Sequence, residues 1–305
     1  MNAHYLEVAR LMARIARNVF ADGVFALKGG TAINLFVRDL PRLSVDLDLV
    51  FVDHTLPRNQ ALAAIGSALQ AIADRLKQLG LDAPGKKTGA AGDSYLNVRS
   101  RDLQVVVEVN EIMRGTLLPV QVRPLQPNAR EILGVDLELP VLAESEVYAG
   151  KLVAAMDRQH PRDLFDVHHL FAAGGITPEM RRCFVAYLVS HNRPVHETLA
   201  PSMKDISATF EGGFEGMARD PVDLKTLLAA RERMIAELRT GLSAAERQFL
   251  LSLTAAEPDW KLLGFPNLGE MPGPRWKLQN LQTLAKKNPA KFRSQQARLT
   301  ELLKI

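Results

Sequence analysis

Cysteine is almost absent from this chain, since one residue, Cys183, occurs among 305. An intramolecular disulfide is therefore impossible, and a reducing compartment is the default expectation. Long apolar runs are also missing, because no stretch reaches the ~18 apolar residues of a membrane span. Arginines recur through the apolar part of residues 1–20 and interrupt any signal-peptide core. We therefore expect a cytoplasmic protein without a membrane anchor.

The chain as a whole has little net charge, but one segment of it is strongly basic. The net charge is only +4, and residues 1–145 hold 16 basic and 16 acidic side chains. Residues 275–305 hold eight lysines and arginines against one acid, Glu301. Such a basic segment suggests a polyanionic partner, although a solvated helix face on a slightly basic protein explains it equally well.

Apolar periodicity predicts an α/β half followed by a helical half. In the first half we expect helices over 3–20, 31–40 and 57–80, and strands over 24–27, 44–51, 94–100, 103–112 and within 115–125. Residues 83–93 are predicted to form a loop. In the second half we expect helices over 144–158, 162–173, 178–190, 223–239, 243–253 and 275–304. The predicted division is an α/β domain, 1–143, followed by a helical domain, 144–305, that completes a cleft.

Two aspartates interrupt the apolar strand SVDLDLVF at 44–51. Because side chains alternate along a strand, Asp46 and Asp48 project the same way, about 7 Å apart. Like charges on one face repel, and each is costly to bury, so the face needs a cation or open solvent. Carboxylate oxygens suit Mg²⁺ (or Mn²⁺), and two such ions about 4 Å apart can hold both reacting oxygens of a phosphoryl transfer.

The segment KGGT, residues 28–31, lies between a predicted strand and a predicted helix. Gly29 and Gly30 allow the backbone to approach a phosphate, and Thr31 can cap the helix and present its hydroxyl. A glycine pair alone is usually a turn, and an Asp-x-Asp alone is usually a loop or a surface strand. The order strand, Gly-Gly-Thr, helix, strand, Asp-x-Asp favours a nucleotide site over either.

The segments ALKGGTAINL and RLSVDLDLVF resemble nucleotidyltransferases of polymerase-β-like fold, and more closely the AbiEii/AbiGii toxin family of bacterial toxin–antitoxin systems. That family carries a Gly-Gly-Thr/Ser turn followed by an Arg-x-Ser-x-Asp-x-Asp strand, which Arg42, Ser44, Asp46 and Asp48 match. The resemblance implies a mixed sheet, with Arg42 and Ser44 supporting the turn or the phosphates.

A second family motif is a lysine early in a helix, followed by Arg-Asp-x-x-Asp. In this chain Lys151, Asp163 and Asp166 take those places. The resemblance implies that Lys151 and Asp166 help to bind the nucleotide and that Lys151 and Asp163 serve catalysis. From spacing alone, a purely structural role explains the two aspartates as well as a nucleotide site does, because negative charge suits the dipole of a helix that starts near Pro161. Without the resemblance, we expect Lys151 to extend its ammonium group into solvent.

Polymerase-like transfer commonly uses a third carboxylate from a neighbouring strand. In LQVVVEVNEI, Glu108 is the acid within an otherwise apolar strand, which makes it the candidate for metal binding or for general-base catalysis. An acid at the rim of the sheet is the alternative.

Together these features predict a cytoplasmic, monomeric, metal-dependent nucleotidyltransferase. The resemblance implies a toxin that transfers NMP from Mg–NTP to RNA, at the 3′ end of tRNA, inhibits growth and has a cognate antitoxin. One alternative keeps the enzyme but replaces RNA with a small molecule, such as an antibiotic, or a protein hydroxyl. Another is a non-catalytic module that binds RNA or a partner protein.

Overall fold

The protein, seen here as a computed structural model, is described over residues 2–87, 93–214 and 216–304. It divides into two compact units, unit 1 comprising Met1–Val147 with Phe214–Pro221, and unit 2 comprising Tyr148–Gly213 with Val222–Ile305. The division falls within helix α5 (Glu144–Arg158). A boundary after residue 143 remains a prediction.

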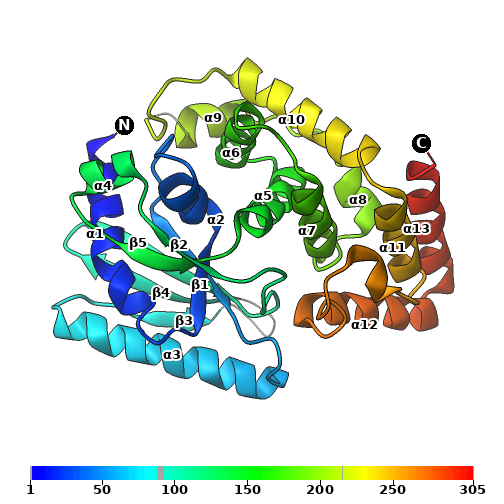
Figure 1. Ribbon diagram of the computed structural model, residues 1–305, viewed down its shortest axis with the longest axis horizontal. Coiled ribbons are helices and arrows are strands. Elements are labelled where there is room, and N and C mark those ends of the chain that lie inside the picture. The colour runs from blue at the N-terminus through cyan, green and yellow to red at the C-terminus, as the bar shows by residue number, and fades with distance from the viewer. Residues whose placement is uncertain (1, 88–92, 215, 305) are drawn as a thin grey trace. The chain divides into compact units, whose positions relative to one another are not determined.

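Unit 1 contains a seven-stranded mixed sheet in the order β3-β4-β5-β2-β1-β7-β6 (Figure 1). Its strands are β1 (Phe25–Lys28), β2 (Asp46–Phe51), β3 (Gly85–Lys87), β4 (Asp93–Ser100), β5 (Leu103–Asn110), β6 (Gln121–Pro124) and β7 (Glu138–Val141). β2 pairs in parallel with β5 and antiparallel with β1. β4 and β5 pair antiparallel across the turn at residues 101 and 102.

Helices bury the apolar face of this sheet. They are α1 (Ala3–Val19), the short α2 (Gly29–Thr31), the π-helix η1 (Ala32–Val37), α3 (Arg58–Gln78) and α4 (Pro127–Leu133). Leu47 of β2 lies with Met12 of α1 and Leu35 of η1 around a small apolar cavity. Since side chains alternate along β2, the aspartates beside Leu47 face away from Met12 and Leu35.

Two expectations for unit 1 need correction. The helix expected over 31–40 begins at Gly29 and continues as the π-helix, a form often found at functional sites. The loop expected over 83–93 contains the strand residues 85–87 and 93, while residues 88–92 lie outside the described part of the chain. The strand expected within 115–125 is confirmed as β6, at the edge of the sheet, and its neighbour β7 was not expected.

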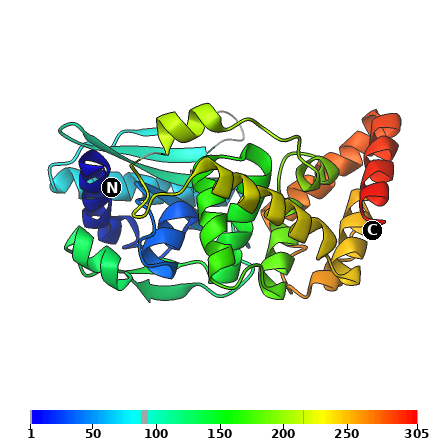
Figure 2. The same ribbon diagram turned by 90° about the horizontal axis from the view of Figure 1, so that it is seen from above.

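Unit 2 is helical. After the remainder of α5 come α6 (Pro161–Ala172), α7 (Pro178–Leu188), α8 (Val195–Leu199), α9 (Ser207–Gly213), α10 (Leu224–Thr240), α11 (Ala244–Thr254), the 3₁₀ turn η2 (Trp260–Leu263), α12 (Pro272–Lys287) and α13 (Pro289–Leu302). α10 packs on α6 and α8, whereas α11, α12 and α13 gather together at the C-terminal end of the unit (Figure 1 and Figure 2). The predicted α/β fold followed by a helical region is confirmed.

The single helix expected over 275–304 is wrong. α12 ends at Lys287 and α13 starts at Pro289. Proline disfavours a helical conformation in the residue before it, and Asn288 is accordingly not helical, with φ −145° and ψ 75°. None of the helices in the described ranges is long and apolar enough to cross a membrane.

Candidate functional site

A row of polar side chains crosses the face of the unit 1 sheet opposite to Leu47. Asp48 is in register with Lys28 of β1 on one side and with Glu108 of β5 on the other. Glu108 is in turn opposite Tyr95 of β4. Residues in register point to the same face of a sheet, so these four side chains line up across four strands. All four are half-buried, whereas the alternating Val105, Val107 and Val109 are fully buried.

The glycine turn lies directly against Asp48. Gly29 has φ +74°, and a Cβ on it would lie 2.0 Å from Asp48 Oδ2. An alanine there would both strain the backbone and displace the carboxylate. Gly30 is also confined, though less tightly, because its Cβ would lie 2.9 Å from Arg42 Nη2 and 3.0 Å from Ser44 Oγ. The two sequence motifs therefore meet, each glycine contacting a residue of the Arg-x-Ser-x-Asp-x-Asp strand.

Three of the predicted nucleotide residues are buried beneath this turn. Arg42 is 2% exposed and donates through Nη1 to the carbonyl of Leu43 at 2.9 Å. Ser44 is also buried, just before β2 begins. Thr31 is 1% exposed, and its hydroxyl donates to the Asp46 carbonyl at 2.5 Å. Thr31 therefore does not cap α2 as expected, but fastens the turn to β2.

The carboxylates of unit 1 suit a divalent cation whose remaining ligands are waters and substrate phosphates. Three carboxylates, those of Asp46, Asp48 and Glu108, project from adjacent strands with the confined Gly29 turn beside them. Within the described ranges no three acidic, histidine or cysteine side chains converge on one point. Mg²⁺ is typically held by one or two carboxylates together with waters and substrate phosphates, so an open set of oxygen ligands fits it.

Unit 2 holds the second motif as a buried ion-pair cluster. Lys151 Nζ lies 2.7 Å from Asp163 Oδ1 and 3.0 Å from Asp166 Oδ2. Arg158 adds a bidentate contact to Asp163, with Nε at 2.5 Å from Oδ2 and Nη2 at 2.9 Å from Oδ1. The α6 aspartates share a face because they are three residues apart. The expected solvent-exposed Lys151 is wrong, since this side chain is 6% exposed.

Electrostatics keep this cluster charged. Burial raises the pKa of Asp163, but the Lys151 ammonium and the Arg158 guanidinium outweigh it and hold that pKa well below the usual range. His160 caps α6, because its Nδ1 accepts from the Arg162 N–H at 3.1 Å. Burial lowers the pKa of His160, which agrees with a neutral ring that accepts a hydrogen bond.

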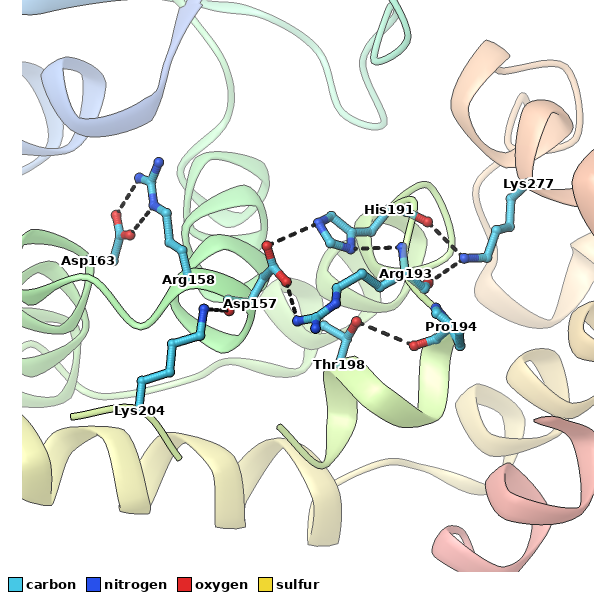
Figure 3. Close-up of polar contacts among 9 residues, drawn as sticks. All are labelled: Asp157, Arg158, Asp163, His191, Arg193, Pro194, Thr198, Lys204 and Lys277. Atoms are coloured by element: carbon cyan, nitrogen blue, oxygen red, sulfur yellow. Dashed lines mark hydrogen bonds and ion pairs between the residues drawn. The ribbon is translucent and has the colours of Figure 1, made fainter. Parts of the chain in front are cut away.

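The cluster is tied to a second polar network through the end of α5 (Figure 3). Asp157, which precedes Arg158, pairs with Arg193 at 2.8 Å and lies 3.7 Å from His191 Nε2. Lys277 of α12 donates to the carbonyls of His191 and Arg193 at 2.8 and 2.5 Å. Contacts within unit 2 therefore run continuously from α12 to the helix that carries Lys151.

Sequence reasoning missed Lys28 and Tyr95 as members of the row on the sheet. The hairpin register that places Lys28 beside Asp48 is set by the β1–β2 pairing, and Tyr95 reaches Glu108 only through the β4–β5 pairing. The alternation of β5 was readable from sequence, but the partners of its polar face were not.

Comparisons with known proteins agree with this geometry. The sequence matches the family described as "Nucleotidyl transferase AbiEii toxin, Type IV TA system" over residues 10–280. A solved structure of MenT4, a nucleotidyltransferase toxin from Mycobacterium tuberculosis H37Rv, matches with a TM-score of 0.60 and 22% identity, covering 82% of this chain and 89% of that one. No curated protein gave a match. The chain thus belongs to the AbiEii family of nucleotidyltransferase toxins of type IV toxin–antitoxin systems, which implies a nucleoside triphosphate co-substrate, a divalent cation and a cognate antitoxin.

Proposed function

We propose that this protein transfers NMP from Mg–NTP to a hydroxyl of RNA, at the 3′ end of tRNA, and thereby inhibits growth. The observation that carries the proposal is the contact between the two motifs of unit 1. The confined Gly29 lies against the Asp48 carboxylate, in line with Glu108 on the next strand. A backbone that can approach phosphates thus adjoins carboxylates that can hold a cation.

In this proposal Asp46 and Asp48 hold Mg²⁺, with Glu108 as a third ligand or as the general base on the attacking hydroxyl. Bound metal would neutralise the charge that builds on the phosphate oxygens. The backbone of residues 29–31 seats the triphosphate, while the buried Arg42 and Ser44 fix the shape of the turn. Attack on the α-phosphate forms the new P–O bond, and pyrophosphate leaves.

We further propose that Lys151 contributes its charge to this reaction. Its ammonium has three N–H groups, and Asp163 and Asp166 account for two of them among the described residues. The same aspartates orient the side chain. Asp163 and Asp166 therefore act as positioning residues for Lys151 rather than as metal ligands.

RNA as the acceptor is supported by the family, whose members are toxins, and by the basic C-terminal helices. A monomer is proposed as the active form. Light scattering of the pure protein should give a mass near 33.7 kDa.

The direct test incubates pure protein with tRNA, Mg²⁺ and each of the four labelled NTPs in turn. Label should enter one discrete RNA band, and Asp46→Asn and Asp48→Asn should each lower the rate at least about 10³-fold. Asp48→Asn removes one of the neighbouring carboxylates and relieves repulsion, so the Tm of this variant should equal or exceed that of the wild type. Asp102→Asn is the matched control, since this exposed carboxylate lies in the β4–β5 turn.

Incorporation that survives both substitutions in β2 refutes the metal assignment. Label found in a protein or in a small molecule, with none in RNA, favours the alternative acceptor. A wild-type chain that binds no Mg–NTP would leave only a non-catalytic binding role.

A further inference from the structure

The structure separates the basic C-terminal segment into one buried and several exposed side chains. Lys277 is 5% exposed and bonds to two carbonyls of the loop before α8. The other basic side chains of the segment are exposed: Arg275, Lys286, Lys287, Lys291, Arg293, Arg298 and Lys304. Lys277 is thus an anchor, whereas the remainder form a charged surface.

The charge is densest where α12 meets α13, in the sequence KKNPAKFR at 286–293, which we call the basic corner. Lys286, Lys287, Lys291 and Arg293 are all exposed there. None of these four side chains forms an ion pair with another described residue. No acid occurs between Glu270 and Glu301 in the sequence, so the corner has no local counter-charge on its own helices.

Only two of the four cations in the basic corner stabilise the helix that carries them. Lys286 and Lys287 end α12, where positive charge complements the helix dipole. Lys291 is the third residue of α13, and Arg293 lies just beyond its first turn, which contains no acid. Cations near a helix N-terminus oppose the dipole, so the stability of α13 alone would favour Asp or Glu there. The helix dipole therefore does not account for Lys291 and Arg293.

The corner also has a fixed shape. Asn288 Oδ1 accepts from the Lys291 N–H at 3.0 Å and caps α13, and Pro289 occupies the first helical position. Lys277, ten residues before the end of α12, fastens that helix to the loop of residues 191–193. Arg193 of that loop pairs with Asp157, the neighbour of Arg158 in the Lys151 cluster (Figure 3). The corner is therefore held in a defined relation to the Lys151 cluster within unit 2.

We infer that the basic corner docks the phosphate backbone of the RNA acceptor. The inference rests on the proposed function, because it names the surface that holds the same substrate. Exposed lysines and arginines on a rigid corner match a polyanion whose phosphates repeat and whose sequence is not read. Binding of this kind is strongly salt-dependent, because each neutralised phosphate releases condensed counterions.

The test compares two quadruple variants, each of which loses four positive charges. The corner variant carries Lys286→Gln, Lys287→Gln, Lys291→Gln and Arg293→Gln. The control variant carries Arg14→Gln, Lys77→Gln, Lys225→Gln and Lys261→Gln, four exposed cations outside the corner. Fluorescence anisotropy with labelled tRNA, without NTP, gives the affinity at several salt concentrations. The corner variant should bind about 10²-fold more weakly at low salt, and the slope of log K against log salt should flatten by about 3. The control should retain most of the affinity.

A transfer assay separates this inference from the proposed function. With a short oligonucleotide ending in CCA, the corner variant should match the wild type in kcat and KM, whereas KM for whole tRNA should rise at least about tenfold. If wild-type protein binds tRNA through the corner but labels no RNA, the transfer reaction fails and the docking surface stands. Equal tRNA affinities of the corner and control variants overturn the inference. A corner variant that keeps its tRNA affinity but no longer binds the antitoxin also overturns it.

A single substitution distinguishes docking from folding. Lys291→Glu places an acid where the α13 dipole favours one, so its Tm should equal or exceed that of the wild type while its tRNA affinity falls. A Tm that falls together with the affinity would show that Lys291 supports the fold, and would count against a docking role for this side chain.

Discussion

The two aspartate pairs of this protein look alike in sequence and differ in their surroundings. Asp46 and Asp48 lie on a strand of unit 1, half-buried, beside a third carboxylate. Asp163 and Asp166 lie on a helix of unit 2, are at most 1% exposed, and contact Lys151 directly. The first pair adds to the negative charge of a carboxylate on the next strand, whereas the second contacts a buried ammonium group.

This difference assigns different physical roles to identical residue types. A buried carboxylate must be paired, and the pair then fixes its cation in place. A half-buried group of carboxylates attracts a cation from solution and repels itself without one. Removing charge should therefore destabilise unit 2 and leave unit 1 folded but inactive.

The largest effect is expected for Lys151→Met. This change leaves Asp163 and Asp166 buried without their shared cation, which typically costs 3–5 kcal/mol. Urea denaturation should show that loss in the free energy of unfolding at pH 7.

Lys28→Met is its matched control, because Lys28 is half-buried on the sheet and forms no ion pair with another described residue. It should change the free energy of unfolding by less than about 0.5 kcal/mol. Equal free energies of unfolding for the two variants would contradict the proposed difference between the two units.

The next effect concerns activity in unit 1. In Gly29→Ala the new methyl group collides with Asp48 Oδ2, and the backbone retains φ +74° at a cost of about 1 kcal/mol. Because a carboxylate displaced by about 1 Å is poorly placed for metal and phosphate, we expect about a 10²-fold loss in the rate of NMP transfer.

Gly134→Ala separates strain from displacement. Gly134 has φ +67° at the end of α4, with nothing near the position of its Cβ. It should lower stability by a similar amount while the transfer rate stays at the wild-type level. A similar loss of activity in both variants would show that strain alone is responsible.

Sequence alone predicted most of the architecture because the relevant signals are local. The alternation of β5, the amphipathic α3 and the helices of unit 2 each follow from periodicity within one segment. The break between α12 and α13 was also signalled, by Pro289, and was missed because the apolar pattern continues across it. The short strand β7 carries Pro140 and has too few residues to show alternation.

The site was predicted less completely, because pairing between distant segments decides it. The sequence indicated that Asp163 and Asp166 lie near the start of a helix, but only the fold shows that Lys151 reaches both. Thr31 was expected to cap a helix and instead bonds to β2, since the helix begins two residues earlier. The row across the sheet depends on strand register, which a single sequence does not specify.

A smaller effect should appear with pH. The pKa of Asp163 lies well below its ordinary 3.8 in the folded state, so the unfolded chain binds its proton first as pH falls. The stabilisation from this carboxylate is complete above about pH 4 and declines by roughly 1.4 kcal/mol per pH unit below that. The stability difference between wild type and Asp163→Asn should be constant from pH 5 to 7 and shrink by about 1 kcal/mol at pH 3. A constant difference down to pH 3 would contradict a lowered pKa.

The smallest effect tests burial within the second cluster itself. Arg158 and Lys151 contact the same carboxylate of Asp163, but the Arg158 side chain is 61% exposed whereas that of Lys151 is 6% exposed. Solvent screens an exposed cation, so Arg158→Gln should cost only about 0.5–1 kcal/mol, several-fold less than Lys151→Met. Urea denaturation of the two variants side by side measures that ratio. If Arg158→Gln costs as much as Lys151→Met, geometry at Asp163 outweighs burial, and the contrast between the two aspartate pairs would need a different cause.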